Sequence, residues 1–169
     1  MVVGLLGGVI GLGAAGALAG IARKMPRALA DTRLTALNVG SAKAVALPAY
    51  GEYTYEKKNE GDSAWWLYYG RDEESGYDGY TLTLKNAKIE SAAAPEGIYA
   101  DGDLHIRLIG ENEIGWGAKD CPTCALRFGG DLLITGAGTL KMAGRECVIE
   151  GTRGNLLVYG DLLLDPDRQ

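Results

Sequence analysis

The sequence predicts an all-β fold, a short three-sided parallel β-helix, and two observations favour it. The first is a unit of three short strands separated by Gly, Asp and Asn corners, which occurs three times, beginning near Ile98, Ala125 and Cys147. Self-similar units of roughly 20 to 30 residues made of strands alone are typical of solenoids, because no unit can bury its apolar side without a neighbour. The second observation is that some corners are as short as two or three residues. Parallel strands of one sheet cannot be joined so tightly, whereas strands of successive sheets around a coil can.

Alternating apolar residues define the inward face of the predicted coils. The regular coils begin at Tyr80, where Leu82 and Leu84 alternate with Thr and Lys residues. Because side chains alternate along a strand, corresponding apolar positions of successive coils should form one inward pair of columns. Its members are Leu82, Leu84, Leu104, Ile106, Leu132, Ile134, Leu156 and Val158. We therefore expect about four coils over residues 80–169.

An uncharged segment stands at the start of the chain. Residues 1–22 contain no charged side chain and consist almost entirely of Gly, Ala, Leu, Val and Ile, and Arg23 and Lys24 follow them. A run of about 20 such residues is long enough to span a bilayer as a helix. We expect residues 1–27 to be a hydrophobic signal or anchor segment, and its small residues at spacings of four would also suit association of helices in lipid. The positive flank alone would place the following domain on the cytoplasmic side, but the solenoid pattern favours export and carries more weight.

A glycine motif inside this segment matches the dinucleotide-binding fingerprint. Residues 11–16 read Gly-Leu-Gly-Ala-Ala-Gly. That mechanism requires a strand before the glycines, a helix after them and a second strand ending in an acidic residue. Only strands follow here, so we interpret the match as a consequence of the Gly/Ala-rich composition.

Residues 28–79 should form N-terminal strands and a cap. Nine of the 13 aromatic residues lie between Tyr50 and Tyr80, interspersed with charged stretches that have the composition of turns. The end of a solenoid exposes apolar core and unpaired strand edges, and large amphipathic rings suit the task of covering them. A platform on which sugar rings stack is the alternative interpretation of the same aromatic residues.

Charge and cysteine content limit the classes of partner. A net charge of −5 and a pI near 4.9 leave no extended basic surface, so we expect no nucleic-acid partner. The cysteines are Cys121, Cys124 and Cys147, an odd number without the spacing of a disulfide framework. A local disulfide, unpaired thiols on a loop or half of a zinc site are all compatible with this number, and the redox compartment stays open.

The repeats resemble segments found in bacterial surface and secreted proteins. The resemblance rests on residues 80–89 (YTLTLKNAKI), 97–112 (GIYADGDLHIRLIGEN) and 130–140 (GDLLITGAGTL), and it covers about half of the chain. It implies a right-handed parallel β-helix. Some members are described as carbohydrate-binding, with acidic polysaccharide and calcium implicated, so the resemblance also implies a polysaccharide or glycan partner. No catalytic motif of these segments can be placed on this sequence.

Two groups of side chains are candidates for ligand binding. His105 and Arg107 should project outward from the middle of a sheet, with Lys85 in the preceding coil, and together they would form a small basic patch. An anionic sugar would suit this patch, because Arg offers a carboxylate two parallel hydrogen bonds. Trp116, in the loop from Gly115 to Cys124, is the best candidate for an exposed ring that contacts sugar.

A column of carboxylates is the candidate metal site. Asp103, Asp131 and Asp161 should occupy the same corner of successive coils, about 4.8 Å apart. Such a column repels itself unless it is screened, and Ca²⁺ prefers oxygen ligands. In the alternative interpretation each Asp accepts hydrogen bonds from nearby backbone N–H groups, as is common at turns.

Three functions remain after these arguments. The leading hypothesis is a non-catalytic carbohydrate-binding module that is exported, membrane-anchored or displayed at the cell surface. The alternative is a structural module whose C-terminal coil, ending in Leu162 to Leu164, stacks end to end on other chains. A polysaccharide-degrading enzyme fragment is the third. One histidine and the lack of a nucleophile motif speak against catalysis.

Overall fold

The computed structural model describes residues 32–58, 64–90 and 94–165, and this part of the chain is all-β. The predicted hydrophobic segment, residues 1–27, lies outside the described residues. Within the described residues, no helix is long and apolar enough to cross a membrane.

The strands form three sheets, which we call A, B and C. Sheet A contains, in spatial order, β1 (Leu37–Val39), β6 (Glu96–Ala100), β9 (Cys124–Phe128) and β12 (Cys147–Gly151). Sheet B contains β13 (Leu156–Val158), β10 (Leu132–Gly136), β7 (Leu104–Ile109), β4 (Asp78–Lys85), β3 (Ala64–Arg71) and β2 (Tyr53–Lys58). Sheet C contains β14 (Asp161–Asp165), β11 (Thr139–Ala143), β8 (Glu111–Ile114) and β5 (Lys88–Ile89).

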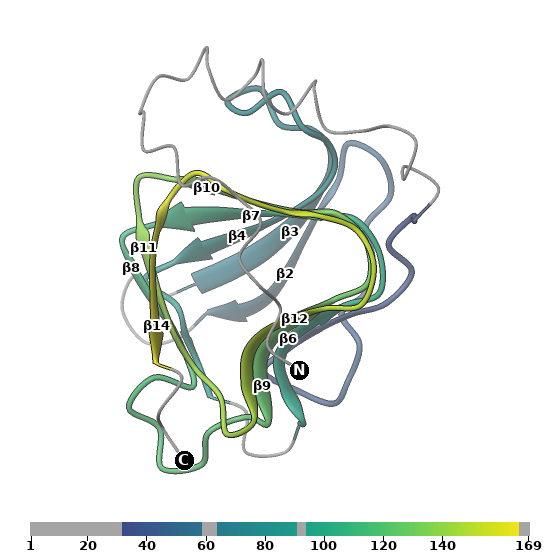
Figure 1. Ribbon diagram of the computed structural model, residues 1–169. Helices are drawn as coiled ribbons and strands as arrows, with labels where there is room; N and C mark the ends of the chain where they lie inside the picture. Colours follow the sequence, from purple (N-terminus) through teal and green to yellow (C-terminus); the bar gives the residue numbers. More distant parts are fainter. Residues whose placement is uncertain (1–31, 59–63, 91–93, 166–169) are drawn as a thin grey trace.

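The chain passes through the three sheets in turn, which makes a solenoid of about three complete turns. The turns are β6 to β8, β9 to β11 and β12 to β14, and β4 with β5 forms an incomplete turn before them. Strands of successive turns pair in parallel, and the sheets surround a common interior (Figure 1). The predicted parallel β-helix is confirmed, with fewer coils than the four that we expected.

The inward columns are also confirmed, although the first coil is displaced. Leu132 pairs with Leu104 and Leu156, and these positions follow the predicted column. Leu82, however, pairs with Ile106, and Leu84 pairs with Leu108. A shift of two residues leaves every side chain on the same face, so all the inward positions of β4, β7 and β10 are buried despite the shift.

Antiparallel strands close the N-terminal side of the solenoid. The aromatic segment forms β2 and β3, which continue sheet B antiparallel to β4, and Tyr69 of β3 stacks on Tyr80 of β4 with ring centroids 4.1 Å apart. Trp65 and Leu67 extend the apolar core beyond β4. In sheet A, β1 runs antiparallel to β6. The described part of the aromatic segment therefore lengthens one sheet.

Asp101 holds the segment before β1 against the first complete coil. Its Oδ1 accepts hydrogen bonds of 2.8 Å from the backbone N–H groups of Thr35 and Ala36. Partial burial raises the pKa of Asp101, but the hydrogen bonds from the Thr35 hydroxyl and these two N–H groups outweigh it and lower the pKa overall. The carboxylate is therefore charged at neutral pH and well suited to this capping role.

Candidate functional site

A polar cluster lies on the outer face of sheet B, centred on His105. The predicted outward orientation of His105 is confirmed, since its neighbours Leu104 and Ile106 point into the core, yet its own exposed fraction is 0%. Its Nδ1 lies 3.0 Å from Oγ1 of Thr81, and its Nε2 lies 2.7 Å from Oγ1 of Thr135. Both ring nitrogens are therefore occupied within the protein.

The loop of residues 72–77, between β3 and β4, covers this cluster. The Tyr77 ring lies 5.2 Å from the His105 ring, and Asp72 and Glu74 both form ion pairs with Arg107. Asp72 Oδ2 also accepts a hydrogen bond of 2.8 Å from the backbone N–H of Ser75, which stabilises the turn. The charge of this acidic loop opposite the predicted basic patch was a usable signal that the sequence analysis missed.

Burial sets the protonation states beneath the loop. Burial, assisted by the charge of Arg107 and opposed by that of Asp72, lowers the pKa of His105 to about 4. Burial, together with the charges of Asp103 and Asp131, raises the pKa of Tyr77. At neutral pH the imidazole is uncharged and the phenol is protonated. Neither ring nitrogen of His105 is open to a ligand from solvent, because each one contacts a Thr hydroxyl. The cluster therefore has a structural role and helps to hold the loop on the sheet.

The predicted basic patch is consequently not an open surface. Lys85 lies on the same outer face, half-buried at the end of β4, where it pairs with Ile109. Arg107 is also half-buried, and its guanidinium is engaged by the loop. Trp116 is half-buried in the loop that connects β8 of sheet C to β9 of sheet A, so it does not belong to sheet B. Carbohydrate binding by these residues stays a prediction, but His105 takes part in it only if the 72–77 loop moves.

The predicted carboxylate column is wrong at its third position. The register aligns Asp103 and Asp131 with Asn155, whereas Asp161 begins β14 in sheet C, opposite Thr139. Repeat counting missed this, because the third corner carries Asn155 in place of an Asp.

Backbone N–H groups occupy the two remaining carboxylates of that column. Asp103 Oδ1 accepts a hydrogen bond of 2.7 Å from the N–H of Asp131, and Asp131 Oδ1 accepts one of 2.7 Å from the N–H of Asn155. Burial and the charge of Asp131 raise the pKa of Asp103, although the Asp131 N–H opposes the shift. The geometry matches the turn-stabilising interpretation, and calcium binding at Asp103 and Asp131 stays a prediction.

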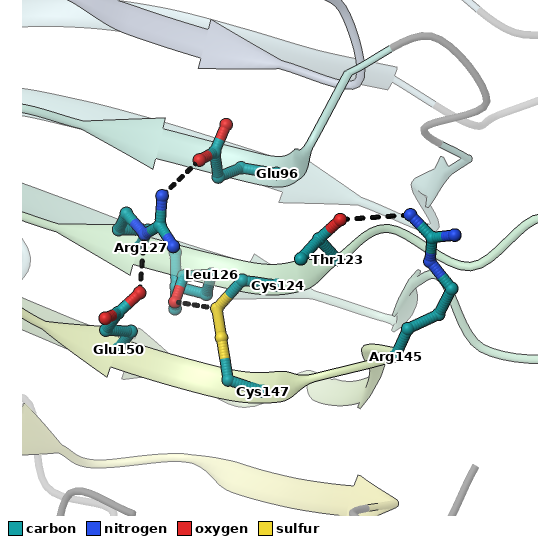
Figure 2. Close-up of a disulfide and its surroundings, with 8 residues drawn as sticks. All are labelled: Glu96, Thr123, Cys124, Leu126, Arg127, Arg145, Cys147 and Glu150. Carbon is teal, nitrogen blue, oxygen red and sulfur yellow. Dashed lines mark hydrogen bonds and ion pairs between the residues drawn. A yellow bond between two sulfur atoms is a disulfide. The ribbon is translucent and has the colours of Figure 1, made fainter. Parts of the chain in front are cut away.

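A disulfide joins the last two turns in sheet A. Cys124 of β9 and Cys147 of β12 are paired in register and bonded to each other, as Figure 2 shows. The separation of 23 residues is one turn of the solenoid. Cys121 lies outside this disulfide, and its thiol donates a hydrogen bond of 3.3 Å to the carbonyl of Gly115. Of the alternatives that the sequence left open, the structure shows the disulfide, so the Cys124 and Cys147 sulfurs are not thiolate ligands for zinc.

Arg127 fastens the same sheet on its outer face. Its Nη1 donates a hydrogen bond to Glu96 of β6 and its Nε donates one to Glu150 of β12, and each bond is 2.6 Å long (Figure 2). One guanidinium thus bridges three consecutive strands. The terminal turn is held to the solenoid by the Arg127–Glu150 ion pair, by the disulfide and by the Asp131 contact with Asn155.

The terminal turn is much less buried than the turn before it. In β10 and β11 the inward residues Leu132, Ile134, Leu140 and Met142 have an exposed fraction of 0%. Their partners in β13 and β14 are Leu156, Val158, Leu162 and Leu164, and all four are only half-buried. Within the described residues, β12, β13 and β14 are also the last strands of their sheets, so each has one edge without a strand partner.

A small pocket lies near the opposite end of the solenoid. It has a volume of about 180 Å³ and is formed by the segment after β1, by β5 and by Trp65. Lys43, Lys88 and Ser41 contribute polar groups, and Glu90 contributes an acidic one. These residues were not predicted as a site, because they lie far apart in the sequence and no local pattern connects them.

No protein-family model, curated protein or solved structure matches this chain. The fold is therefore established by strand register, and the functional proposals that follow rest on the geometry of the terminal turn and of the pocket.

Proposed function

We propose that this protein is a structural assembly module that associates with another copy of the chain through its terminal turn, β12 to β14. The observation that carries the proposal is the contrast in burial between corresponding inward residues of the last two turns. The half-buried residues are large and aliphatic. Complete burial of such a side chain from full exposure contributes about 1.5 to 3 kcal/mol, and a half-buried one can still gain the part that remains. Four of them on one surface supply a substantial driving force for association.

The open strand edges add a second contribution. An edge strand presents a row of N–H and C=O groups that can pair with another chain, and soluble proteins commonly protect such edges. Leu163, on the outer face of β14, is 51% exposed beside these edges. At the opposite end of the solenoid sheets A and B end in antiparallel strands, so the two ends present strand edges of different direction.

Mass as a function of concentration tests this function. We expect the full chain to associate at micromolar concentrations in sedimentation experiments, and Leu163→Lys to weaken the association by introducing a charge beside the edges. Tyr53→Lys is the matched control. Tyr53 is 54% exposed but lies in β2, at the edge of sheet B opposite the terminal strand β13. A wild-type chain that stays monomeric over the whole range would contradict the proposal, and so would equal effects of the two variants.

Carbohydrate binding is the second candidate, and the pocket beside Trp65 favours it. Trp65, which is 5% exposed, and the lysines Lys43 and Lys88 all line this pocket, and Lys88 also forms an ion pair with Glu113. An anionic sugar unit would suit this lining, because it can contact the edge of the indole and pair with the two cations. The resemblance to carbohydrate-binding repeats supports the same class of ligand. Titration with an oligouronate, followed by calorimetry, tests it with two variants. Lys43→Ala/Lys88→Ala should abolish binding at the pocket, whereas loss only in Lys85→Ala/Arg107→Ala would place the ligand on sheet B.

Export to an oxidising compartment accompanies both candidates. Disulfides persist mainly in secreted and periplasmic proteins, and the Cys124–Cys147 pair agrees with that environment. Alkylation of protein taken directly from its natural source should modify one thiol per chain. Modification of all three would contradict export.

A further inference from the structure

The direction of the strands limits how two copies can meet. A head-to-tail stack would place the terminal turn of one copy on the β1, β2 and β5 side of the next. There, sheets A and B end in strands that run antiparallel to their neighbours, and sheet C ends in β5, which has only two residues. The three edges of the terminal turn would not find three equivalent edges, so an open-ended filament is disfavoured.

A two-fold axis across the terminal turns avoids this mismatch. Such an axis reverses the strand direction in all three sheets together, so every edge meets an antiparallel partner. Because the sheets form a triangle, the axis passes through one sheet, which pairs with itself, and exchanges the other two. Three arrangements are therefore possible, with sheet A, B or C on the axis.

Charge distinguishes the three arrangements. Asp161 and Asp165 are the two end residues of β14, so pairing β14 with its own copy would bring these carboxylates together. Arg145 and Arg153 are exposed and lie just before and just after β12, and Arg145 also donates a hydrogen bond to Thr123. Pairing β12 with β14 of the other copy brings Arg153 beside Asp161, twice by symmetry, whereas at the other corner the exposed Glu146 offsets Arg145 beside Asp165.

The strand left on the axis is β13, and its sequence suits that position. It reads Leu156-Leu157-Val158 and carries no charge. Antiparallel pairing centred on Leu157 keeps the inward residues Leu156 and Val158 on the core side of both copies. This arrangement joins the two apolar interiors and places Arg153 of each copy beside Asp161 of the other.

We propose that two copies of this chain form a closed dimer, terminal turn against terminal turn, about a two-fold axis through β13, with β12 of each copy paired to β14 of the other. The proposal rests on the assembly function above and specifies its geometry. In this dimer Leu157 lies opposite Leu157 of the second copy, with Cα atoms about 4.5 to 5.5 Å apart, which is within reach of a disulfide.

Cysteine cross-linking of the full chain tests the axis. In a Cys121→Ser background, Leu157→Cys should give a covalent dimer under mild oxidation, at concentrations at which the parent associates. Leu163→Cys is the matched control, because Leu163 is more exposed than its neighbours but lies in β14, which this axis separates from its symmetry mate. Cross-linking through position 163 and not through position 157 would overturn the proposal.

Charge exchange provides a second readout that does not depend on new thiols. Arg153→Glu and Asp161→Arg, made separately, should each weaken the dimer about tenfold, and the double variant should recover most of the loss. Additive losses in the double variant would contradict the pairing of these corners. Association without cross-linking at position 157 would reject the two-fold geometry and retain the assembly function, whereas a monomer would reject both.

Discussion

Nε2 of His105 lies 2.7 Å from Oγ1 of Thr135, while Nδ1 of the same ring lies 3.0 Å from Oγ1 of Thr81. One imidazole thereby joins β4, β7 and β10, three consecutive strands of sheet B. A side chain on the outer face of the solenoid has become part of its interior, because the 72–77 loop excludes water from it.

Replacing His105 should therefore destabilise the fold. His105→Ala removes the partner of two buried Thr hydroxyls and leaves a cavity, and we expect the free energy of unfolding to fall by about 3 kcal/mol. Chemical denaturation checks this. Lys85→Ala, on the same face but half-buried, should change the free energy by less than about 0.5 kcal/mol. Equal effects of the two substitutions would contradict the buried role of His105.

Stability should also depend on pH through His105. Its folded pKa of about 4 lies below the unfolded value of about 6.5, so between these values the unfolded chain binds a proton that the folded chain does not. Stability should fall as the pH drops from about 6.5 to 4, by roughly 3 kcal/mol from this residue. The measurement is the difference in pH slope between the wild type and His105→Asn, which should lack this component. Parallel slopes would show that His105 titrates normally.

Breaking the disulfide should loosen the terminal turn in particular. A cross-link that closes a loop of this length contributes about 3 kcal/mol in the chain-entropy account. We expect Cys124→Ala/Cys147→Ala to lose about that amount, with faster amide hydrogen exchange concentrated in β12 to β14. Cys121→Ser, which leaves the disulfide intact, is the control. Uniformly faster exchange across all three sheets would contradict a local role for the disulfide.

Gly136 should tolerate no side chain. It has φ of +110°, and a Cβ atom there would collide with the backbone of Leu108 in the preceding coil. Gly117 also has a positive φ, +71°, but has open space around it. Gly117→Ala should cost about 1 kcal/mol from backbone strain, whereas Gly136→Ala should cost at least about 2 kcal/mol more. Similar losses in thermal denaturation would show that the coils can separate locally.

The sequence was sufficient to predict the solenoid because its signals are local. Alternation along Leu104 to Leu108 defines the inward face, and two-residue corners require a change of sheet. The same signals could not determine the register of β4. This strand follows β3, its antiparallel partner, and so it lacks the preceding Gly/Asp corner by which the later coils can be aligned. A shift of two residues also leaves the pattern of burial unchanged, so burial does not determine the register.

The site was less predictable because it depends on contacts between distant segments. The residues adjacent to His105 do not show that residues 72–77 cover it. The signal lies in the acidic charge of that distant loop, which forms ion pairs with Arg107. A local disulfide was left open by the sequence, but its pairing across two turns was not predicted, because the repeats were aligned with Ala125, not Cys124, against Cys147. The predicted carboxylate column was wrong at Asp161 for a similar reason, because the register aligns Asn155, and not Asp161, with Asp131.

Sedimentation equilibrium of the full chain from about 1 to 100 µM tests the central claim most directly. The account predicts a monomer–dimer equilibrium that reaches a limit at twice the chain mass, with Leu163→Lys shifted toward monomer and Tyr53→Lys unchanged. A monomer at every concentration would contradict the assembly function, and growth without a limit would contradict the closed two-fold dimer.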